Sequence, residues 1–117
     1  MAKRFFGVSQ ASTTLVQADA KRWVESYTGE AFDLIIDDLF GEIDGEPQRA
    51  ITVSESWVLA LLNCMTAHAG LVTNFDDGSG LKRSALYQSV RARAHFLSAF
   101  RLETPLYQNN ISAYFRH

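Results

Sequence analysis

Apolar and polar residues follow one another along the chain in runs whose spacing predicts a series of strands and helices. Short β-prone runs at 13–17 (TTLVQ), 32–39 (FDLIIDDL) and 71–75 (LVTNF) predict three strands. Helical spacing predicts helices over 20–27, from a cap at Thr52 or Ser54 to about residue 67, and over 81–95. Thr52 and Glu55 also have the spacing of a capping box.

The end of the chain predicts two more strands, in SAFRLETP and NNISAYFRH, which form a closing antiparallel pair. The element order is therefore β-α-β-α-β-α-β-β. Because Leu34, Ile35 and Ile36 are consecutive, we expect both faces of their strand to be covered, as in a parallel sheet. No repeat or linker interrupts the pattern, so residues 1–117 are predicted to form one α/β domain with a mainly parallel sheet and helices on both faces.

Composition narrows the classes of partner. The chain has 117 residues with 11 basic and 13 acidic side chains, a net charge of −2, which argues against a nucleic-acid partner. No apolar stretch approaches the roughly 20 residues needed to span a bilayer, and the start is too polar for a signal peptide. The single cysteine, Cys64, excludes an internal disulfide framework and a cysteine-rich zinc site. We therefore expect no membrane partner and a cytoplasmic location.

Acidic and basic residues are concentrated in two separate runs of the sequence. A solvated surface is the simplest interpretation of each run. The first run, 30–46, has no Lys or Arg, and the second, 82–101, has no acid. The acids are Glu30, Asp33, Asp37, Asp38, Glu42, Asp44 and Glu46, and the bases are Lys82, Arg83, Arg91, Arg93 and Arg101.

Acidic side chains also follow the predicted strands, at the edge where α/β sheets bind their ligands. Asp19 follows the first strand, Asp37 and Asp38 end the second, and Asn74, Asp76 and Asp77 end the third. Such acids suit a cationic substrate or a general base near an amine. Asp19 equally suits a helix cap, and Asp37 and Asp38 simple strand termination. Adjacent strand residues point to opposite faces, so Asp37 and Asp38 cannot address one site in the same way.

The sequence contains no motif that indicates a metal site, a reactive thiol, a serine nucleophile or a phosphate-binding loop. His68, His95 and His117 share no ligand spacing, so we predict no metal site. Cys64 lies in the apolar register of its helix and is expected in the core. No G-x-S-x-G nucleophile elbow and no G-x-x-x-x-G-K phosphate loop occurs.

Four segments in order, AKRFFGV, LVQADAKRWV, FDLIIDDLF and ITVSESWVLALLNCMTAHAGLVTNF, resemble the spermidine synthase-like proteins of the S-adenosylmethionine-dependent methyltransferase fold. The resemblance runs from Lys3 to about Phe75. It implies a partial Rossmann-like fold and either S-adenosylmethionine or its decarboxylated form as the cofactor, with no metal. The implied substrate is an amine.

The resemblance also implies roles for particular residues. In that family an acid after the third strand of the fold binds the adenine amino group, and Asp19 with Ala20 stands there. The acid that ends the fourth strand takes the proton of the amine, which makes Asp38 the expected catalytic residue. Asp37 beside it is expected to contribute to the cofactor site.

Two features depart from the family. Polyamine synthases continue from this acid as D-S-x-D-P, whereas here the segment is Asp38-Leu39-Phe40-Gly41-Glu42, so polyamine specificity is not implied. The usual N-terminal strand and glycine-rich cofactor loop are also missing, so the chain looks like the last two-thirds of the fold. In the parent order the missing strands separate TTLVQ from FDLIIDDL, so their absence exposes one edge of FDLIIDDL.

Three functions remain open. The first is a partial transferase domain with weak or no autonomous activity. The second is a competent aminopropyl- or methyltransferase completed by a partner chain, and the third is a non-catalytic protein-interaction module. Either TTLVQ pairs directly with FDLIIDDL or another chain covers the edge, and we expect a homodimer through the Phe32–Leu39 strand.

Overall fold

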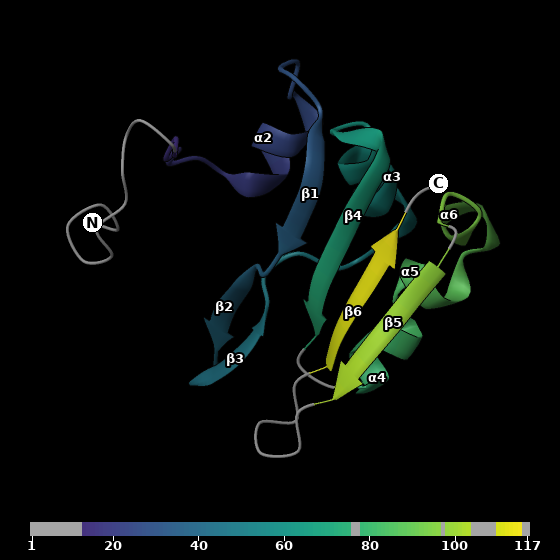
Figure 1. Cartoon of the computed structure of the whole chain (residues 1–117). Helices are drawn as coiled ribbons and strands as arrows, with labels where there is room; N and C mark the ends of the chain where they lie inside the picture. Colours follow the sequence, from purple (N-terminus) through teal and green to yellow (C-terminus); the bar gives the residue numbers. More distant parts are fainter. Residues whose placement is uncertain (1–12, 76–77, 97, 104–109, 116–117) are drawn as a thin grey trace.

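The computed structural model describes residues 13–75, 78–96, 98–103 and 110–115 and has a mixed α/β architecture (Figure 1). A four-stranded sheet has the order β1 (Phe32–Asp37), β4 (Met65–Phe75), β6 (Asn110–Phe115) and β5 (Ser98–Glu103). β2 (Phe40–Ile43) and β3 (Glu46–Arg49) form a separate hairpin between β1 and the first long helix. The helices are α2 (Ala20–Glu25), α3 (Glu55–Leu62), α4 (Gly78–Arg83), α5 (Ala85–Gln88) and α6 (Val90–Arg93).

Strand directions match the sequence prediction only in part. β1 and β4 are parallel, whereas β4 pairs with β6, and β6 with β5, in the antiparallel sense. The predicted C-terminal antiparallel pair is confirmed. β1, β4 and β5 run in the same direction, as a mainly parallel sheet requires, but β6 runs against them, so β1 and β4 form the one parallel pairing of the described sheet. The reason is that β6 inserts between β4 and β5, so the last hairpin contributes both antiparallel ladders.

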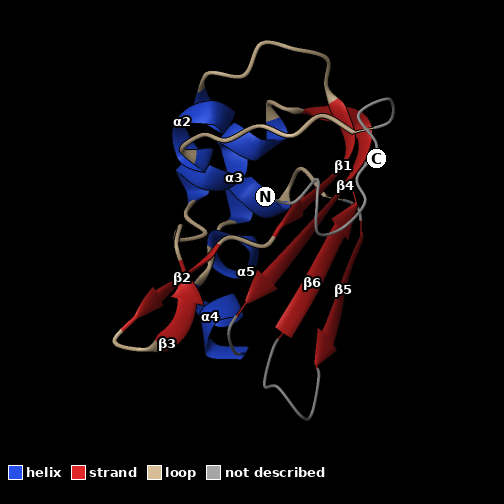
Figure 2. Cartoon of the chain, turned by 90° about the vertical axis from the view of Figure 1, so that its left-hand side faces the viewer, coloured by secondary structure: helices blue, strands red, loops and turns tan. Residues whose placement is uncertain are grey.

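The described helices cover one face of the sheet. Figure 2 shows α2, α3, α4 and α5 on the same side of the four strands. The core lies between these layers and includes Val58, Leu71, Phe75 and Leu86, each at most 1% exposed. The prediction of helices on both faces is therefore wrong for the described part of the chain. The β1–β4 crossover and the segment from β4 to β5 both pass over this one face.

β1 is consequently an edge strand with one bare face. Ile35 packs against the core, but Leu34 is 54% and Ile36 66% exposed, so the expectation that both faces are covered is wrong. The TTLVQ segment, predicted as a strand, is irregular, and its Leu15 and Val16 are exposed. It does not pair with β1, so the alternative in which TTLVQ covers the outer edge of β1 is wrong, and that edge has no partner strand among the described residues.

Capping serines set several helix boundaries. Ser54, and not the alternative Thr52, caps α3, because its hydroxyl accepts a hydrogen bond from the Trp57 amide at 3.2 Å. The helix then ends at Leu62, earlier than expected, because β4 already begins at Met65. The helix predicted over 81–95 is divided into α4, α5 and α6 by extended backbone at Ser84 and Ser89.

The acidic loop after β1 is a regular hairpin rather than an irregular connection. Phe40 pairs with Arg49 and Ile43 with Glu46. The turn residues Asp44 and Gly45 have φ angles of 52° and 78°, the left-handed conformation that two-residue hairpin turns require. Within the described residues, no helix has the length and apolar character needed to cross a membrane.

Candidate functional site

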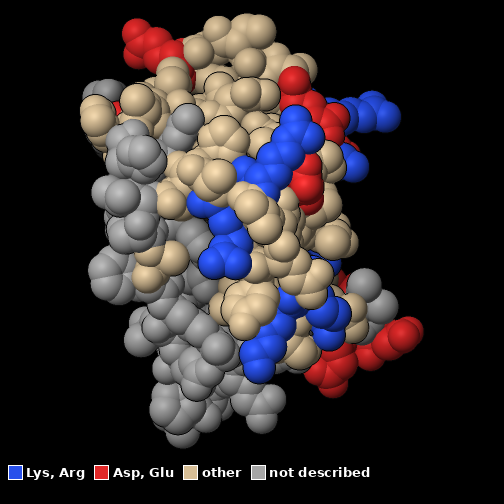
Figure 3. Space-filling model, turned by 90° about the vertical axis from the view of Figure 1, so that its right-hand side faces the viewer, with Lys and Arg blue, Asp and Glu red and all other residues tan. Residues whose placement is uncertain are grey.

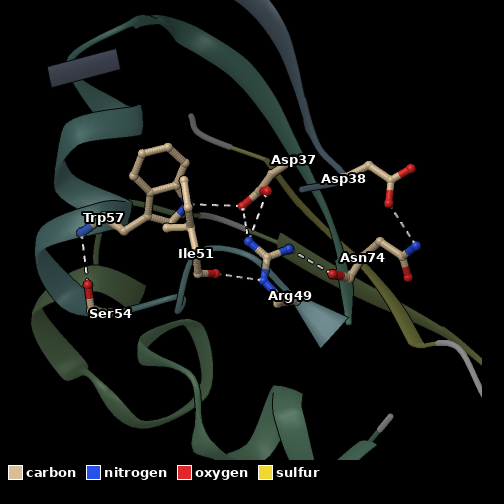
Figure 4. A network of polar contacts seen from close by, with 7 residues as sticks. All are labelled: Asp37, Asp38, Arg49, Ile51, Ser54, Trp57 and Asn74. Atoms are coloured by element: carbon tan, nitrogen blue, oxygen red, sulfur yellow. Dashed lines mark hydrogen bonds and ion pairs between the residues drawn. The ribbon is translucent and has the colours of Figure 1, made fainter. Parts of the chain in front are cut away.

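Asp37 ends β1 and Asp38 follows it, and the two point to opposite sides of the sheet, as the alternation of strand residues predicts (Figure 4). Asp37 points toward α3 on the helix-covered side and is 3% exposed. Asp38 points away from Trp57 and is exposed. The two adjacent acids therefore belong to different environments.

Arg49, the last residue of β3, holds the buried carboxylate of Asp37. Its Nη2 donates to both carboxylate oxygens of Asp37, at 2.9 and 2.8 Å. Trp57 of α3 adds a third hydrogen bond, from Nε1 to Asp37 Oδ2 at 3.0 Å. The side chains of Arg49 and Asp37 are 9% and 1% exposed, so the ion pair is largely removed from water.

The remaining donors of Arg49 reach backbone carbonyls. Nε donates to the Ile51 carbonyl at 3.0 Å, and Nη1 donates to the Asn74 carbonyl at 2.8 Å. The guanidinium also lies 5.8 Å from the centre of the Phe75 ring, within the range of a cation–π contact. Arg49 thus fastens the β2–β3 hairpin to the carboxyl ends of both β1 and β4.

This geometry gives Asp37 a structural role. Its carboxylate is paired, hydrogen-bonded and shielded, which is what a buried charge requires. Little of either oxygen is left for a cofactor, so the geometry disfavours the cofactor role that the resemblance implies for Asp37. Arg49 was not among the residues predicted for the site, and its one signal in the sequence is that it is the first cation after the seven acids of 30–46.

Asp38, the expected catalytic residue, lies on the bare side of the sheet. Its Oδ1 accepts a hydrogen bond from Asn74 Nδ2 at 3.0 Å. The carboxylate is exposed and near the carboxyl end of β4, so it remains accessible to a cationic group. Its catalytic role stays a prediction. Asp76 and Asp77, the other acids expected at this edge, lie outside the described residues.

Asp19 caps α2, because its Oδ1 accepts a hydrogen bond from the Arg22 amide at 3.0 Å. The cap does not hide the residue, which is exposed and borders a cleft of about 550 Å³. The start of α2 forms one wall of this cleft, and the segments next to β1 and β3 form the other. The lining residues are Asp19, Ala20, Lys21, Arg22, Glu25, Leu39, Ala50 and Ile51.

The structure thus separates the predicted site residues. Asp19 and Ala20 share the cleft, which is the pairing that the resemblance implies for adenine. Among the described residues that line it, neither Asp37 nor Asp38 is included. The binding and reacting groups expected from the sequence are therefore not brought together in one described cavity.

A second cleft, also of about 550 Å³, lies on the other side of α2 and is mainly apolar. Trp23, Tyr27 and Phe32 line it, and their ring centres lie 4.8 to 6.4 Å apart. Val16 and Ala18, from the segment before α2, complete the apolar wall. Trp23 and Tyr27 lie in the helix predicted over 20–27, and their helical spacing does not reveal this cleft.

Metal and thiol chemistry receive no support from the described residues. No cluster of three or more His, Cys, Asp or Glu side chains suited to a metal ion occurs among them. Cys64 is buried as predicted, and its thiol points to the carbonyls of Val24 and Ala60 at 3.6 and 3.5 Å. Burial raises the pKa of this thiol, which disfavours the reactive thiolate.

Basic side chains gather on a different part of the molecule. Lys82, Arg83, Arg91 and Arg93 are all exposed, and Lys and Arg run down the side that faces the viewer in Figure 3. Only Arg91 of this group forms an ion pair in the described structure, a 3.5 Å contact with Glu55. The two charge runs seen in the sequence are therefore mostly solvated surface, as the simplest interpretation predicts.

Comparison with known proteins adds no family assignment to this geometry. No protein-family model matches the chain, and a search of the curated proteins finds no match.

Proposed function

We propose that the chain is a partial spermidine synthase-like transferase domain that holds an adenine nucleoside and has weak or no autonomous activity. The observation that carries this proposal is the cleft shared by Asp19, Ala20, Leu39 and Ile51. Its volume lies within the usual range for small-molecule sites. Its lining combines apolar surface from Ala20, Leu39, Ala50 and Ile51 with the charged side chains Asp19, Lys21, Arg22 and Glu25. A carboxylate beside apolar surface suits a flat base that carries an exocyclic amino group.

The residues in the cleft fit the nucleoside part of the implied cofactor. The exposed carboxylate of Asp19 would accept a hydrogen bond from the adenine amino group, and Leu39, Ala50 and Ile51 would provide apolar surface for the ring. When bound, the cofactor supplies an alkyl group on a sulfonium, which is transferred to the amine. Asp38 would take the proton from that amine, but it lies outside the lining of the cleft.

The sheet order also supports the proposal. In the doubly wound strand order 3-2-1-4-5-6, strands two and one separate the third strand from the fourth. Here β1 corresponds to the fourth strand, and the TTLVQ segment to the third. β1 is at the edge of the described sheet, and TTLVQ pairs with no described strand. This arrangement is expected when the two intervening strands, and the glycine-rich loop between strand and helix, are missing.

Two other functions remain as alternatives. The open edge of β1 favours a protein-interaction module, for which nucleosides would be irrelevant. A transferase completed by a partner chain would use Asp38 as its general base, so Asp38→Asn should abolish its turnover. The cytoplasm remains the proposed location for each of these functions.

The test of the proposal is a calorimetric titration of the whole chain with methylthioadenosine. Asp19→Ser is the informative variant, because serine also caps helices but lacks the carboxylate. We expect Asp19→Ser to keep the melting temperature and to weaken nucleoside binding by about tenfold or more, the effect of losing one charge-assisted hydrogen bond.

Asp19→Ala serves as the control for the cap, since it should weaken binding and also cost about 1 kcal/mol of stability. Binding that is unchanged in Asp19→Ser would remove Asp19 from the site. No heat from the unmodified chain at millimolar ligand would contradict nucleoside binding altogether and leave the interaction module as the better proposal.

A further inference from the structure

The free edge of β1 combines unpaired backbone with exposed apolar side chains. β1 pairs with β4 on one side, and no described strand lies on the other (Figure 1). Leu34 and Ile36 pair with Gly70 and Val72 of β4. Because strand residues alternate, they lie on the face opposite to that of Asp37, which points toward the helices. At 54% and 66% exposure they are among the most exposed large apolar residues of the described chain. An open edge of this kind is a template for pairing with another strand.

Exposed acids without a cationic partner in the described structure lie on β1, next to it and on the hairpin beyond its end. The ion pairs of that structure are Arg49 with Asp37 and Arg91 with Glu55. The exposed acids are Glu30, Asp33, Asp38, Glu42, Asp44 and Glu46.

We propose that the free edge of β1 binds an extended, apolar segment of another polypeptide that carries Lys or Arg at its ends. Backbone hydrogen bonds to the edge would provide affinity, as in other complexes formed by strand addition. Alternate apolar side chains of the bound segment would cover Leu34 and Ile36. Its basic ends would lie against Asp33 and Asp38, which gives the site its preference for charge. This inference does not depend on nucleoside binding.

The same charges argue against a second copy of the chain as the occupant. Residues opposite each other in an antiparallel pair share a face, so Leu34 must face Leu34 or Ile36 of the second copy. The register that pairs Leu34 with Ile36 places Asp33 opposite Asp37. The register that pairs Leu34 with Leu34 places Glu30 opposite Asp38. In the second register the like charges of Glu30 and Asp38 destabilise the pairing. In the first, Arg49 already neutralises Asp37, but either register brings the unpaired acids Glu30, Asp33 and Asp38 of two copies to one edge, which disfavours a second copy.

The experiment uses the whole chain and two synthetic peptides of alternating valine and threonine. One peptide has lysines at both ends, and the other has glutamates in their place. Binding is measured by calorimetry, and the backbone amides of β1 are followed by NMR. We expect the basic peptide to bind more tightly than the acidic one by about tenfold or more, and the largest amide shifts to fall in β1.

Ile36→Lys is the blocking variant, because it places a cation on the edge without touching the core. Val90→Lys is its matched control, since Val90 is an equally apolar residue, 80% exposed, on α6 rather than β1. Ile36→Lys should lower the affinity for the basic peptide by about tenfold, whereas Val90→Lys should change that affinity by less than about twofold.

A charge variant tests the acids separately. Asp33→Asn with Asp38→Asn removes two charges but keeps oxygens that can accept the hydrogen bonds from Thr66 and Asn74. Affinity for the basic peptide should fall and become less sensitive to salt. Circular dichroism confirms that each variant is folded.

Several results would overturn the proposal. These are failure of the basic peptide to bind, equal affinity for both peptides, or equal losses in Ile36→Lys and Val90→Lys. A dimer seen in sedimentation that disappears in Ile36→Lys but persists in Val90→Lys would identify a second copy as the occupant. That result would instead support the homodimer expected from the sequence.

Discussion

Arg49 donates from all three of its guanidinium nitrogens, and its acceptors belong to three different segments of the chain. Asp37 ends β1, Asn74 lies near the end of β4, and Ile51 precedes α3. A single side chain therefore holds together elements that are separated in sequence. Removing it would leave a buried carboxylate without its counterion, which is more costly than removing the pair as a whole.

We predict that Arg49→Met lowers the free energy of unfolding by about 3 kcal/mol or more. The same substitution should cost much less in an Asp37→Asn background, because the amide is uncharged and its oxygen still accepts from Trp57 Nε1. Urea unfolding of the two single variants and the double variant measures the coupling between them. Equal costs in both backgrounds would show that the ion pair contributes nothing.

Alternation along a strand is what made Asp37 and Asp38 predictable as residues of opposite faces. Which of the two is buried was not predictable, because that depends on Arg49 and Trp57, which lie 12 and 20 residues further along the chain. The capping role of Asp19 was one of two roles that the sequence allowed, and the structure adds the cleft beside it. The direction of neighbouring side chains and the helix cap could therefore be predicted from the sequence, whereas contacts between residues far apart in the chain could not.

At the scale of an element, the β2–β3 hairpin depends on a turn that only some residues can adopt. Gly45 has a φ angle of 78°, and a Cβ added there would meet nothing within 4 Å. Any cost of Gly45→Ala therefore comes from the backbone conformation alone. Because the hairpin ends at Arg49, the turn also influences how well that residue reaches Asp37.

Gly45→Ala should lower the free energy of unfolding by about 1–2 kcal/mol, the penalty for a left-handed alanine. Gly41→Ala, in the same hairpin, is the control. It has no positive φ angle, and an added Cβ would lie 3.8 Å from the Cβ of Ala50, an ordinary contact. Thermal unfolding compares the two. Similar melting temperatures for both variants would contradict the assigned turn conformation.

Asp44-Gly45 is a strong hairpin-turn signal, yet no strand is predicted over 40–49, because the two strands are short and contain Pro47. The prediction of a single helix over 81–95 is wrong for a related reason. Ser84 and Ser89 interrupt a good apolar stripe, and Ser89 starts α6 by accepting from the Ala92 amide while its hydroxyl donates to Glu55. Periodicity alone does not reveal such internal caps.

For the whole molecule, a sheet covered on one face implies a gradient of protection from solvent. β4 lies between β1 and β6, and Ala69, Leu71 and Phe75 on its inner side are at most 1% exposed. β1 lies at the edge and residues 13–17 lie outside the sheet. Opening free energies should therefore fall from β4 to β1 to the segment before α2.

Amide hydrogen exchange should follow that order, with the β4 amides slowest and those of residues 13–17 fastest. Adding the basic peptide should slow exchange in β1 selectively. If β1 exchanged as slowly as β4 in the free protein, its edge would already be covered in solution.

The strands at 32–39 and 71–75 and the final antiparallel pair are predicted by the sequence, since each depends on local patterning. The sequence did not predict the bare face of β1. Three consecutive apolar residues indicate that a strand can be buried on both sides, but they do not reveal whether another segment is present to cover them. Whether a second layer covers the strand depends on how the other segments pack, which the residues of the strand alone do not specify.

The hydrogen bond from Trp57 to Asp37 has an optical consequence. The chain has two tryptophans, and they occupy different surroundings. Trp57 is 3% exposed and bonded to a carboxylate, whereas Trp23 is half-buried and lines the apolar cleft. With Trp23 replaced by phenylalanine, the emission spectrum of Trp57 would report on the Arg49–Asp37 pair alone. Trp57 can therefore serve as an intrinsic fluorescent probe of the place where the β2–β3 hairpin, the sheet and α3 meet.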